Sequence, residues 1–425
     1  MTALWIALLG GLGFGIPVAF VLLGVALLYF VTNDVPDEIV VQRLVSGVES
    51  FPLLAVPLFV LAGTLMAHGG IARRLLDFAE GLVGHLKGGL GQVNVVNSVL
   101  MGGMSGSANA DAAVDAKILV PIMIRKGYSR QFSSALSAAS GIISPLIPPG
   151  IGLIMYGILA QVSIGRLFAA GIVPGLMVAV ALMIVVRIIA GRRKYGAERQ
   201  GILPIRKILQ LAKRGLWALM MPVLLIIGLR IGVFTPTELG AIAAVYALIV
   251  GVFLYKEIRI TQLPGIFREA TLTSAVVMLI VGAAAAFSAV ITREKIPQML
   301  VGGLLSITDN ALVLLLIINI GLLLLGTLME GTALLVILAP ILAPVGVLLG
   351  VDPVQFGIII VLNLTIGALT PPIGTIMFTV SSITGTTVRE YTREIWPMLA
   401  AVISVLLLIT YFPPLTMTLA NLLYG

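Results

Sequence analysis

The chain contains no cysteine and only two histidines, His68 and His85, among its 425 residues. Without thiols there are no disulfides, thiolate metal sites or cysteine nucleophiles. Two imidazoles are also too few for the usual histidine-rich metal centres, so we expect neither a transition metal nor haem. The sequence lacks a Gly-rich phosphate loop followed by Lys and Ser or Thr, and we therefore expect no ATP hydrolysis and no organic cofactor.

Charged residues are also scarce. They make up 10% of the chain, whereas 59% of its residues are apolar, and a soluble domain carries about 25% charged residues. The mean hydropathy of +1.15 and the long apolar runs predict an all-α polytopic membrane protein in a lipid bilayer. No charged segment precedes the first apolar run and no small-residue cleavage site follows it, so we expect this run to stay in the membrane.

The net charge of +8 is concentrated in one segment. Nine basic residues and one acidic residue, Glu198, lie between Arg187 and Arg214, and the rest of the chain is neutral, with 17 basic and 17 acidic residues. A basic segment between two apolar runs is typical of a cytoplasmic loop under the positive-inside rule. We prefer this interpretation of residues 187–214 to nucleic-acid binding, and we expect no nucleic-acid partner.

Apolar runs near the length of a bilayer crossing, about 20 residues, recur along the chain. The first could form one helix or two helices split between Gly13 and Pro17. Short charged segments at 71–86, 263–269 and 293–305 are expected to lie flat on the membrane surface. The runs occupy residues 3–31, 51–67, 88–124, 131–165, 167–187, 216–233, 237–255, 271–291, 309–350, 354–386 and 395–420.

The run 88–124 has the wrong length for ordinary crossings, because it is too short for two spans and too long for one. Its middle, from Ser105 to Asp111, is polar. Non-helical backbone at membrane depth is tolerated only where protein or a water-filled cavity satisfies its hydrogen bonds. We therefore expect a re-entrant hairpin whose polar tip forms part of a binding site.

The sequence matches itself at a distance of 223 residues. This displacement places Pro148 and Pro149 on Pro371 and Pro372, and a displacement of 219 continues the match upstream. The match predicts a duplication. The first repeat would be 1–190, with its hairpin at about 88–124 and a broken helix at about 131–165, followed by the basic connector 191–214 and the second repeat, 215–425, with its hairpin at about 309–350 and broken helix at about 354–386.

Charge placement favours opposite orientations for the two repeats. Lys87 and Arg125 flank the first hairpin, so both of its ends are expected on the cytoplasmic side. Asp309 and Asp352 flank the second hairpin, which is expected to enter from outside. Paired interrupted segments in an inverted repeat are the usual sequence sign of a secondary transporter.

Each repeat is expected to combine a small polar tip with a helix broken at two prolines. Proline removes a backbone donor and glycine permits unwinding, so carbonyl oxygens become available to a ligand. Neutral oxygens suit Na⁺, whereas helix N-termini favour a carboxylate, and this combination is typical of sodium symport. A single such motif could be only a packing kink, but four in a duplicated arrangement favour function.

Charged residues within these motifs are functional candidates, because charge inside a membrane is costly. We expect a role for Asp111, whereas Asp115 and Lys117 are expected near the interface. For Glu330, a proton relay and stabilisation of a helix N-terminus stay equal alternatives. The histidines have no carboxylate partner at ligand spacing, and Ser105 would need one of them as a base to act as a hydrolase nucleophile.

The string Gly102–Ala113, the breaks Ser144–Gly150 and Gly367–Gly374 and the chain length resemble the large membrane subunit (M, or DctM-like) of tripartite ATP-independent periplasmic (TRAP) transporters. The resemblance implies a non-enzymatic protein of the bacterial inner membrane with an elevator-type ion-transporter fold. Such a protein imports an organic anion, a dicarboxylate or an acidic sugar such as sialic acid, together with sodium. It also implies two partners, a separate small four-helix membrane subunit and a periplasmic substrate-binding protein.

The resemblance further implies about two sodium ions, each held where a hairpin tip meets the broken helix of its own repeat. The alternatives are a stand-alone dicarboxylate or ion exchanger and, more remotely, an intramembrane serine hydrolase built on Ser105. The implied residues are Ser105, Ser107, Asn109, Ser144 and Pro145 for the first ion; Gly326, Thr327, Met329, Gly367, Thr370 and Pro372 for the second; and Asn109, Asp111, Thr332, Pro149 and Gly374 for the substrate.

Overall fold

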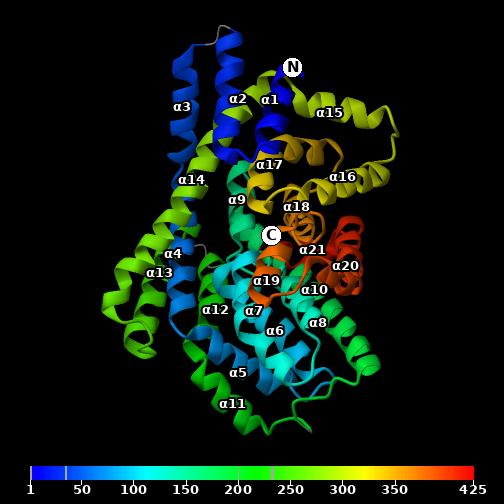
Figure 1. Ribbon diagram of the computed structural model, residues 1–425. Coiled ribbons are helices and arrows are strands. Elements are labelled where there is room, and N and C mark those ends of the chain that lie inside the picture. The colour runs from blue at the N-terminus through cyan, green and yellow to red at the C-terminus, as the bar shows by residue number, and fades with distance from the viewer. Residues whose placement is uncertain (1, 34–35, 200, 231–233) are drawn as a thin grey trace.

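The computed structural model describes residues 2–33, 36–199, 201–230 and 234–425. In this part of the chain helices are joined by short turns, and no strand occurs. Two groups of helices lie side by side, one on the left of Figure 1 and one on its right. The left-hand group, called the α14 group below, comprises α2 (Val18–Thr32), α3 (Asp37–Val48), α4 (Ala55–His68), α13 (Pro236–Ile249) and α14 (Leu263–Arg293).

The second group, called the hairpin group, contains two helix pairs, each followed by an interrupted helix. The pairs turn at 106–107 and at 327–330, and the interruptions run over 142–150 and 368–374. These are the segments where the sequence predicts polar tips and proline breaks. The group comprises α6 (Gly89–Ser105), α7 (Ala108–Arg125), α8 (Arg130–Gly141), α9 (Ile151–Leu159), α10 (Ile164–Arg193), α16 (Ala311–Gly326), α17 (Gly331–Leu348), α18 (Pro353–Gly367), α19 (Thr375–Thr384), α20 (Val388–Tyr411) and α21 (Pro414–Tyr424).

The helix pairs lie at opposite ends of the hairpin group, α6 in the lower part of Figure 1 and α16 and α17 in its upper part. Contacts cross between the halves, because α19 packs against α7 and α17 packs against α9. Each interrupted helix therefore touches the helix pair of the other half. This crossing brings the two tips toward a common centre.

The structure shows how the first and last apolar runs are divided, a question that the sequence left open for the first run. The first is two helices, α1 (Thr2–Gly13) and α2, separated at 14–17. The last is also two helices, because α20 ends at Tyr411 and α21 begins after Pro413; proline lacks the N–H that continues a helix. The run 216–233 begins as α12 (Leu216–Arg230), and its final three residues lie outside the described residues.

The expectation that 263–269 is a separate surface segment is wrong. These residues are the beginning of α14, whose 31 residues correspond to about 46 Å of helix. Pro264 lies in the first turn, where its missing N–H has no intrahelical partner to lose, and no proline follows within the helix. The charged Arg268 and Glu269 are exposed on its surface, so their charge does not end it.

Four short helices lie in or next to charged segments of the sequence. Two of them, α5 (Ile71–Val83) and α15 (Ile296–Leu305), occupy the segments expected on the membrane surface. The other two, α3 and α11 (Ile205–Arg214), were not predicted because charged residues interrupt their apolar pattern. Both helices lie against a neighbour, α3 along α14 and α11 along α5.

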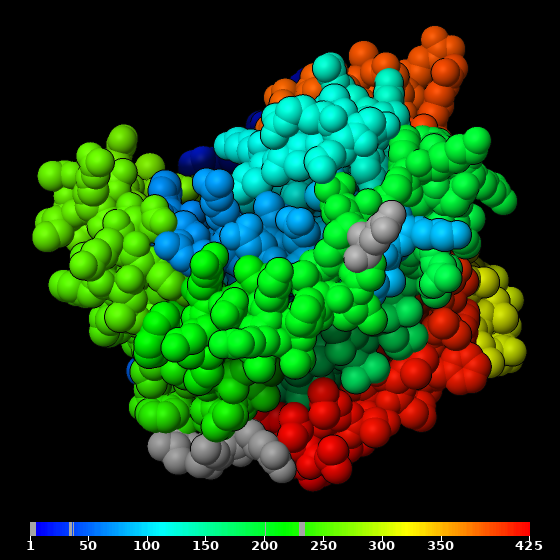
Figure 2. All heavy atoms as spheres, turned by 90° about the horizontal axis from the view of Figure 1, so that it is seen from below, coloured from blue at the N-terminus to red at the C-terminus, as the bar shows by residue number. Residues whose placement is uncertain are grey.

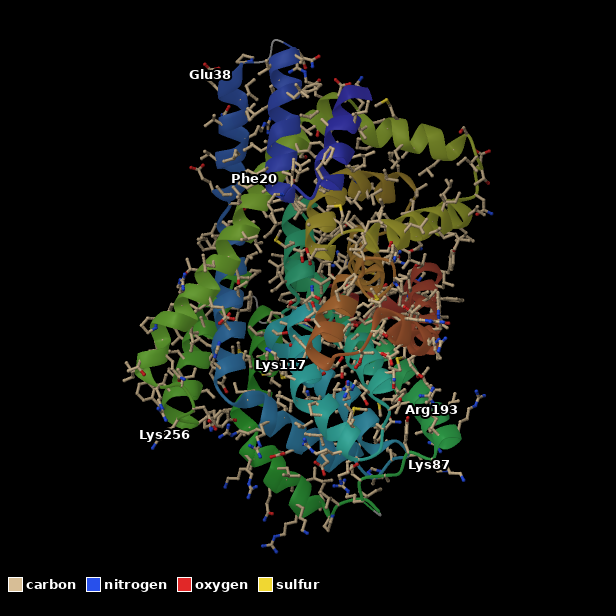
Figure 3. All side chains as sticks on the ribbon, viewed as in Figure 1. Phe20, Glu38, Lys87, Lys117, Arg193 and Lys256 are labelled. Atoms are coloured by element: carbon tan, nitrogen blue, oxygen red, sulfur yellow. The ribbon has the colours of Figure 1, made fainter. Side chains whose placement is uncertain are left out.

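The long helices identify a multi-pass membrane protein. Among the described residues, six helices are long and apolar enough to cross a bilayer, or seven when α11 and α12 are counted as one bent span. Lys87, Arg193 and Lys256 lie at the lower end of the molecule in Figure 3, and Glu38 lies at its upper end. This separation of charge follows the direction expected from the positive-inside rule.

A buried polar network joins the two helices of the first pair. Asp115 of α7 is 1% exposed and accepts hydrogen bonds from the Asn97 amide and the Ser98 hydroxyl of α6, both at 2.8 Å. The expected interfacial position of Asp115 is therefore wrong, although Lys117 on the same helix is exposed. Burial is possible because side chains from the facing helix supply the donors that water would otherwise provide.

Asp115→Ala is expected to destabilise the protein by on the order of 2–3 kcal/mol. The Asn97 amide loses its acceptor in a buried site, and the Ser98 hydroxyl keeps only the Asn94 carbonyl at 3.2 Å. The measurement is unfolding in mixed micelles of sodium dodecyl sulfate. Asp77→Ala is the control, because Asp77 is exposed and surface changes are usually worth less than about 0.5 kcal/mol. If both variants unfolded at the same proportion of sodium dodecyl sulfate, a structural role for the network would be contradicted.

Candidate functional site

A cavity of about 90 Å³ lies where the two hairpin tips meet. The α6–α7 tip contributes Ser107, Ala108 and Asn109, and the α16–α17 tip contributes Glu330, Gly331 and Thr332 to the wall. The interrupted helices supply the remaining sides, and their second parts, α9 and α19, lie near the centre of the molecule in Figure 1. Further lining residues are Pro145, Ile151, Gly152, Leu335, Val361, Leu364, Thr365, Ala368, Thr375, Ile376 and the tip glycine Gly106.

Four helices begin at this cavity. The first residues of α7, α9, α17 and α19 are Ala108, Ile151, Gly331 and Thr375, and all four line its wall. The first turn of a helix has N–H groups without intrahelical acceptors and carries a partial positive charge. Because four such ends converge, the cavity is suited to an anionic group although no Lys, Arg or His is among its described lining residues.

Glu330 is the one charged side chain among the described lining residues. Its Oε2 atom accepts a hydrogen bond of 2.8 Å from the Ala333 backbone N–H, so Glu330 caps α17. Of the two roles considered from the sequence, stabilisation of the helix N-terminus is the one that the geometry shows. The capping carboxylate offsets the positive end of α17, and Asp111 lies in the first turn of α7, so α9 and α19 are the two helix ends at the cavity that have no such acidic residue.

Two buried polar atoms in the cavity wall lack partners. These are Asn109 Oδ1 and Thr375 Oγ1, neither of which has a hydrogen-bond partner among the described residues. Buried polar groups are normally satisfied, so these atoms are available to a ligand or water. Thr375 was missed in the sequence, although its position directly after the glycine of the second break was a signal for a hydroxyl at a helix N-terminus.

At the first tip, a backbone hydrogen bond joins the hairpin to the interrupted helix. The Ile151 N–H donates to the Gly106 carbonyl at 3.2 Å. Gly106 has a φ of +58°, and a Cβ atom there would collide with the Pro149 carbonyl oxygen. Glycine is therefore the residue that permits both the positive φ of this turn and the close contact with the Pro149 carbonyl.

The first set of implied ion ligands divides between this junction and the cavity. The Ser144 hydroxyl donates to the Asp111 carboxylate, which Ser105 also approaches, and Asp111 Oδ1 is buried without a partner among the described residues. Ser105, Asp111 and Ser144 thus form an oxygen cluster behind the tip. By contrast, Ser107, Asn109 and Pro145 line the cavity itself.

The second junction is built in the same way. The Ile373 N–H donates to the Thr327 carbonyl at 3.2 Å, and the Gly374 N–H donates to the Thr370 carbonyl at 3.3 Å. The backbones of the tip and the break are in contact, because a Cβ at Gly367 would lie 2.5 Å from the Gly326 Cα. The implied ligands that stand at this junction rather than in the described cavity lining are Gly326, Thr327, Met329, Gly367, Thr370 and Pro372.

The implied substrate residues are also divided. Asn109 and Thr332 line the cavity from opposite tips. Asp111, Pro149 and Gly374 are outside the described lining and stand one layer behind it. In place of Gly374, its neighbour Thr375 presents the polar atom.

The histidines are not part of the site. His68 Nε2 lies 3.1 Å from Glu269 Oε2, and both side chains are exposed, so the expectation that His68 has no carboxylate partner is wrong. The fold brings Glu269 to it from 201 residues away. Ser105 Oγ accepts from the Ser107 N–H at 3.2 Å, and the described hydrogen bonds include none between Ser105 and a histidine. The described contacts therefore offer Ser105 no histidine base, as the hydrolase alternative would require.

Comparison with known proteins identifies the family. Residues 4–415 match the family described as "Tripartite ATP-independent periplasmic transporter, DctM component". The chain belongs to the DctM family of TRAP transporters. It is a transporter permease subunit, a class of protein that is not enzymatic.

Curated relatives of this DctM-family chain match over nearly its whole length. The sialic acid TRAP transporter large permease protein SiaM of Vibrio cholerae is 42% identical over 98% of this chain and 97% of the relative. The C4-dicarboxylate TRAP transporter large permease protein DctM of Pseudomonas aeruginosa is 36% identical over 91% and 90%. The isethionate TRAP transporter permease protein DctMQ of Oleidesulfovibrio alaskensis is 37% identical over 96% of this chain but only 64% of the relative.

Gly367→Ala is expected to destabilise the hairpin group by about 1–3 kcal/mol, because the added methyl group must push the two backbones apart. It should also reduce ligand binding, since the same contact holds the second tip against its break. Thermal unfolding in detergent measures the first effect. Gly321→Ala in α16 is the control, because nothing lies within 4 Å of a Cβ at that position; a matching loss in the control would contradict the proposed backbone contact.

Proposed function

We propose that this chain imports an organic anion into the cell in symport with sodium. The proposal is carried by the convergence of four helix N-termini on one cavity that lacks a basic side chain among its described lining residues. The N-termini of α9 and α19 have no acidic residue in their first turn. The substrate carboxylate would accept hydrogen bonds from these N–H groups, with Asn109 and Thr332 beside it and the Thr375 hydroxyl as a further donor. Preformed N–H groups bind an anion without burying a second full charge.

The names of the relatives support an anionic substrate. Sialic acid, C4-dicarboxylate and isethionate are the substrates in the names of three of them, and all three are organic anions with different carbon skeletons. A cavity that recognises the acid group through backbone N–H groups accommodates such variety. A dicarboxylate or an acidic sugar is therefore the substrate class that we propose.

Sodium coupling is supported by the oxygen clusters at the two junctions. The first offers Ser105, Ser144 and the unpartnered Asp111 Oδ1, and the second offers main-chain carbonyls around Gly326 and Gly367. Oxygen ligands suit a hard cation, and about two ions, one at each junction, would offset the charge of the anion. Binding of the cations next to the cavity would stabilise the tips in the arrangement that receives the substrate.

The arrangement of helices supports an inverted repeat and an elevator movement. The two helix pairs lie at opposite ends of the hairpin group in Figure 1, and the junction at Gly106 and Ile151 has its counterpart at Thr327 and Ile373. The hairpin group would slide as one body against the α14 group. The cavity lies entirely within the hairpin group, so such a movement would carry the ligand without dismantling its site.

We further propose that the protein acts in the bacterial inner membrane with a small membrane subunit and a periplasmic binding protein. The greater length of the DctMQ relative, of which this chain covers 64%, supports a further membrane component. The basic lower end, with Lys87, Arg193 and Lys256 in Figure 3, would face the cytoplasm. The second candidate, a stand-alone exchanger, would transport without these partners.

Uptake into proteoliposomes that contain all three components tests the proposal. Replacement of sodium by potassium is expected to reduce uptake at least about tenfold, because the larger cation fits the oxygen clusters poorly. Omission of the binding protein should have a similar effect. Uptake that is unchanged in potassium would contradict sodium coupling, and uptake that persists without the partners would favour the exchanger.

Asn109→Ala and Thr332→Ala are each expected to raise the substrate KM about 10–100-fold, since a lost hydrogen bond to a charged ligand is worth roughly 1.5–3 kcal/mol. The same assay, performed over a range of substrate concentrations, provides the measurement. Thr273→Ala is the control, because Thr273 is exposed on α14 and donates only to the Glu269 carbonyl of its own helix among the described contacts. Wild-type kinetics in both site variants would remove the cavity as the substrate site.

A further inference from the structure

The basic connector contains an amphipathic helix, α11, whose position in the fold is unusual. None of its ten residues is buried, and it is bent by 76° from α12, the apolar helix that follows it. Since α12 has the composition of a membrane span, a helix at such an angle to it runs close to the plane of the membrane. Seen from below, the connector and α11 lie across the lower face beside α5 (Figure 2).

One apolar edge of α11 packs against protein and another does not. Leu211 faces α5, where a Cβ at Gly81 would lie 2.7 Å from its Cδ1 atom. The other apolar edge presents Ile205 and Leu209, which are 70% and 61% exposed, and Ile202, just before the helix, is 72% exposed. Ile205 and Leu209 are one helical turn apart, so they lie together on the same face.

The charged side of α11 is uncompensated within the described structure. Arg206, Lys207, Lys213 and Arg214 are all exposed, and none of them takes part in an ion pair among the described residues. Glu198, the one acidic residue of the basic segment, is occupied elsewhere, because its Oε2 atom lies 2.9 Å from Lys126 Nζ. Four positive charges therefore lie beside an exposed apolar edge, and no acidic side chain of the described residues pairs with them.

We propose that α11 binds the acidic phospholipid headgroups of the cytoplasmic leaflet. The basic side chains would contact lipid phosphates, while Ile202, Ile205 and Leu209 would enter the boundary between headgroups and acyl chains. Basic charge on one face of a surface helix and apolar residues on the other are the features of interfacial helices that bind anionic membranes. Trp217, 42% exposed at the start of α12, marks the same level, because tryptophan is enriched at membrane interfaces.

This assignment gives the connector a mechanical role. Because α11 joins α10 of the hairpin group to α12, a helix held by the lipid surface would fix the connector at one level of the membrane. If the hairpin group moved, the chain segment between α10 and α11 would then change its conformation, and α12 would keep its position. Lipid binding itself does not depend on which anion the cavity carries.

The absence of cysteine makes a direct test possible. A nitroxide label is attached to Leu209→Cys on the apolar edge or to Gln210→Cys, which is exposed and follows at about 100° around the helix. Accessibility of each label to oxygen and to a water-soluble nickel chelate is measured in nanodiscs of phosphatidylcholine with or without about 30% phosphatidylglycerol. The 209 label is expected to shift several-fold toward oxygen when the acidic lipid is present, and the 210 label to remain in water.

A charge variant tests whether the basic side chains of α11 cause the response to acidic lipid. Combined substitution of Arg206, Lys207, Lys213 and Arg214 by Gln should abolish the response of the 209 label to phosphatidylglycerol, whereas Arg389→Gln with Arg393→Gln, two exposed bases on α20, should leave it intact. The proposal is overturned if the 209 label stays water-accessible in both lipids. It is also overturned if only addition of a protein partner shields the label.

Discussion

The backbone of this protein has to meet two opposing requirements, one set by the bilayer and one set by the binding site. Hydrocarbon requires that every backbone N–H and carbonyl be satisfied, whereas the proposed site for a cation and an anion requires some of these groups to be free. The chain meets both demands by joining each hairpin tip to the break that faces it. The bonds from Ile151 to Gly106 and from Ile373 to Thr327 satisfy part of the unwound backbone and leave neighbouring carbonyls and N–H groups for ligands.

Glycine makes this arrangement possible because the two backbones must approach closely. At the second junction Gly326 and Gly367 face each other without side chains, and at the first Gly102 packs against Ser144, where a Cβ would lie 2.9 Å from the serine Cα. Close approach also shortens the distance over which the oxygen clusters and the helix ends act. The proposed cation and anion sites would therefore be coupled by position, and ligand binding at one would stabilise the geometry of the other.

Local sequence signals predicted the tips and breaks but not the contacts between distant helices. Two local signals were the polar string from Ser105 to Asp111 and the paired prolines at 148–149 and 371–372. These residues interrupt the helix at their own positions, so the sequence predicts the interruption without knowledge of distant contacts. The burial of Asp115 instead requires donors from α6, and the partner of His68 comes from 201 residues away. In these two cases composition indicated an interfacial or unpaired side chain, and tertiary packing decided the outcome.

The chemistry of the cavity bears on where substrate selectivity arises. Backbone N–H groups at helix ends recognise negative charge but do not distinguish the carbon skeleton of the anion, because these N–H groups are the same in every sequence. Discrimination by side chains in the described lining is limited to a few groups, chiefly Asn109, Thr332, Thr365 and Thr375. A permease of this kind gains from a separate component that selects the ligand first. Under the proposed mechanism, an anion site with little selectivity of its own, coupled to cations, would suffice to transport the ligand that this component delivers.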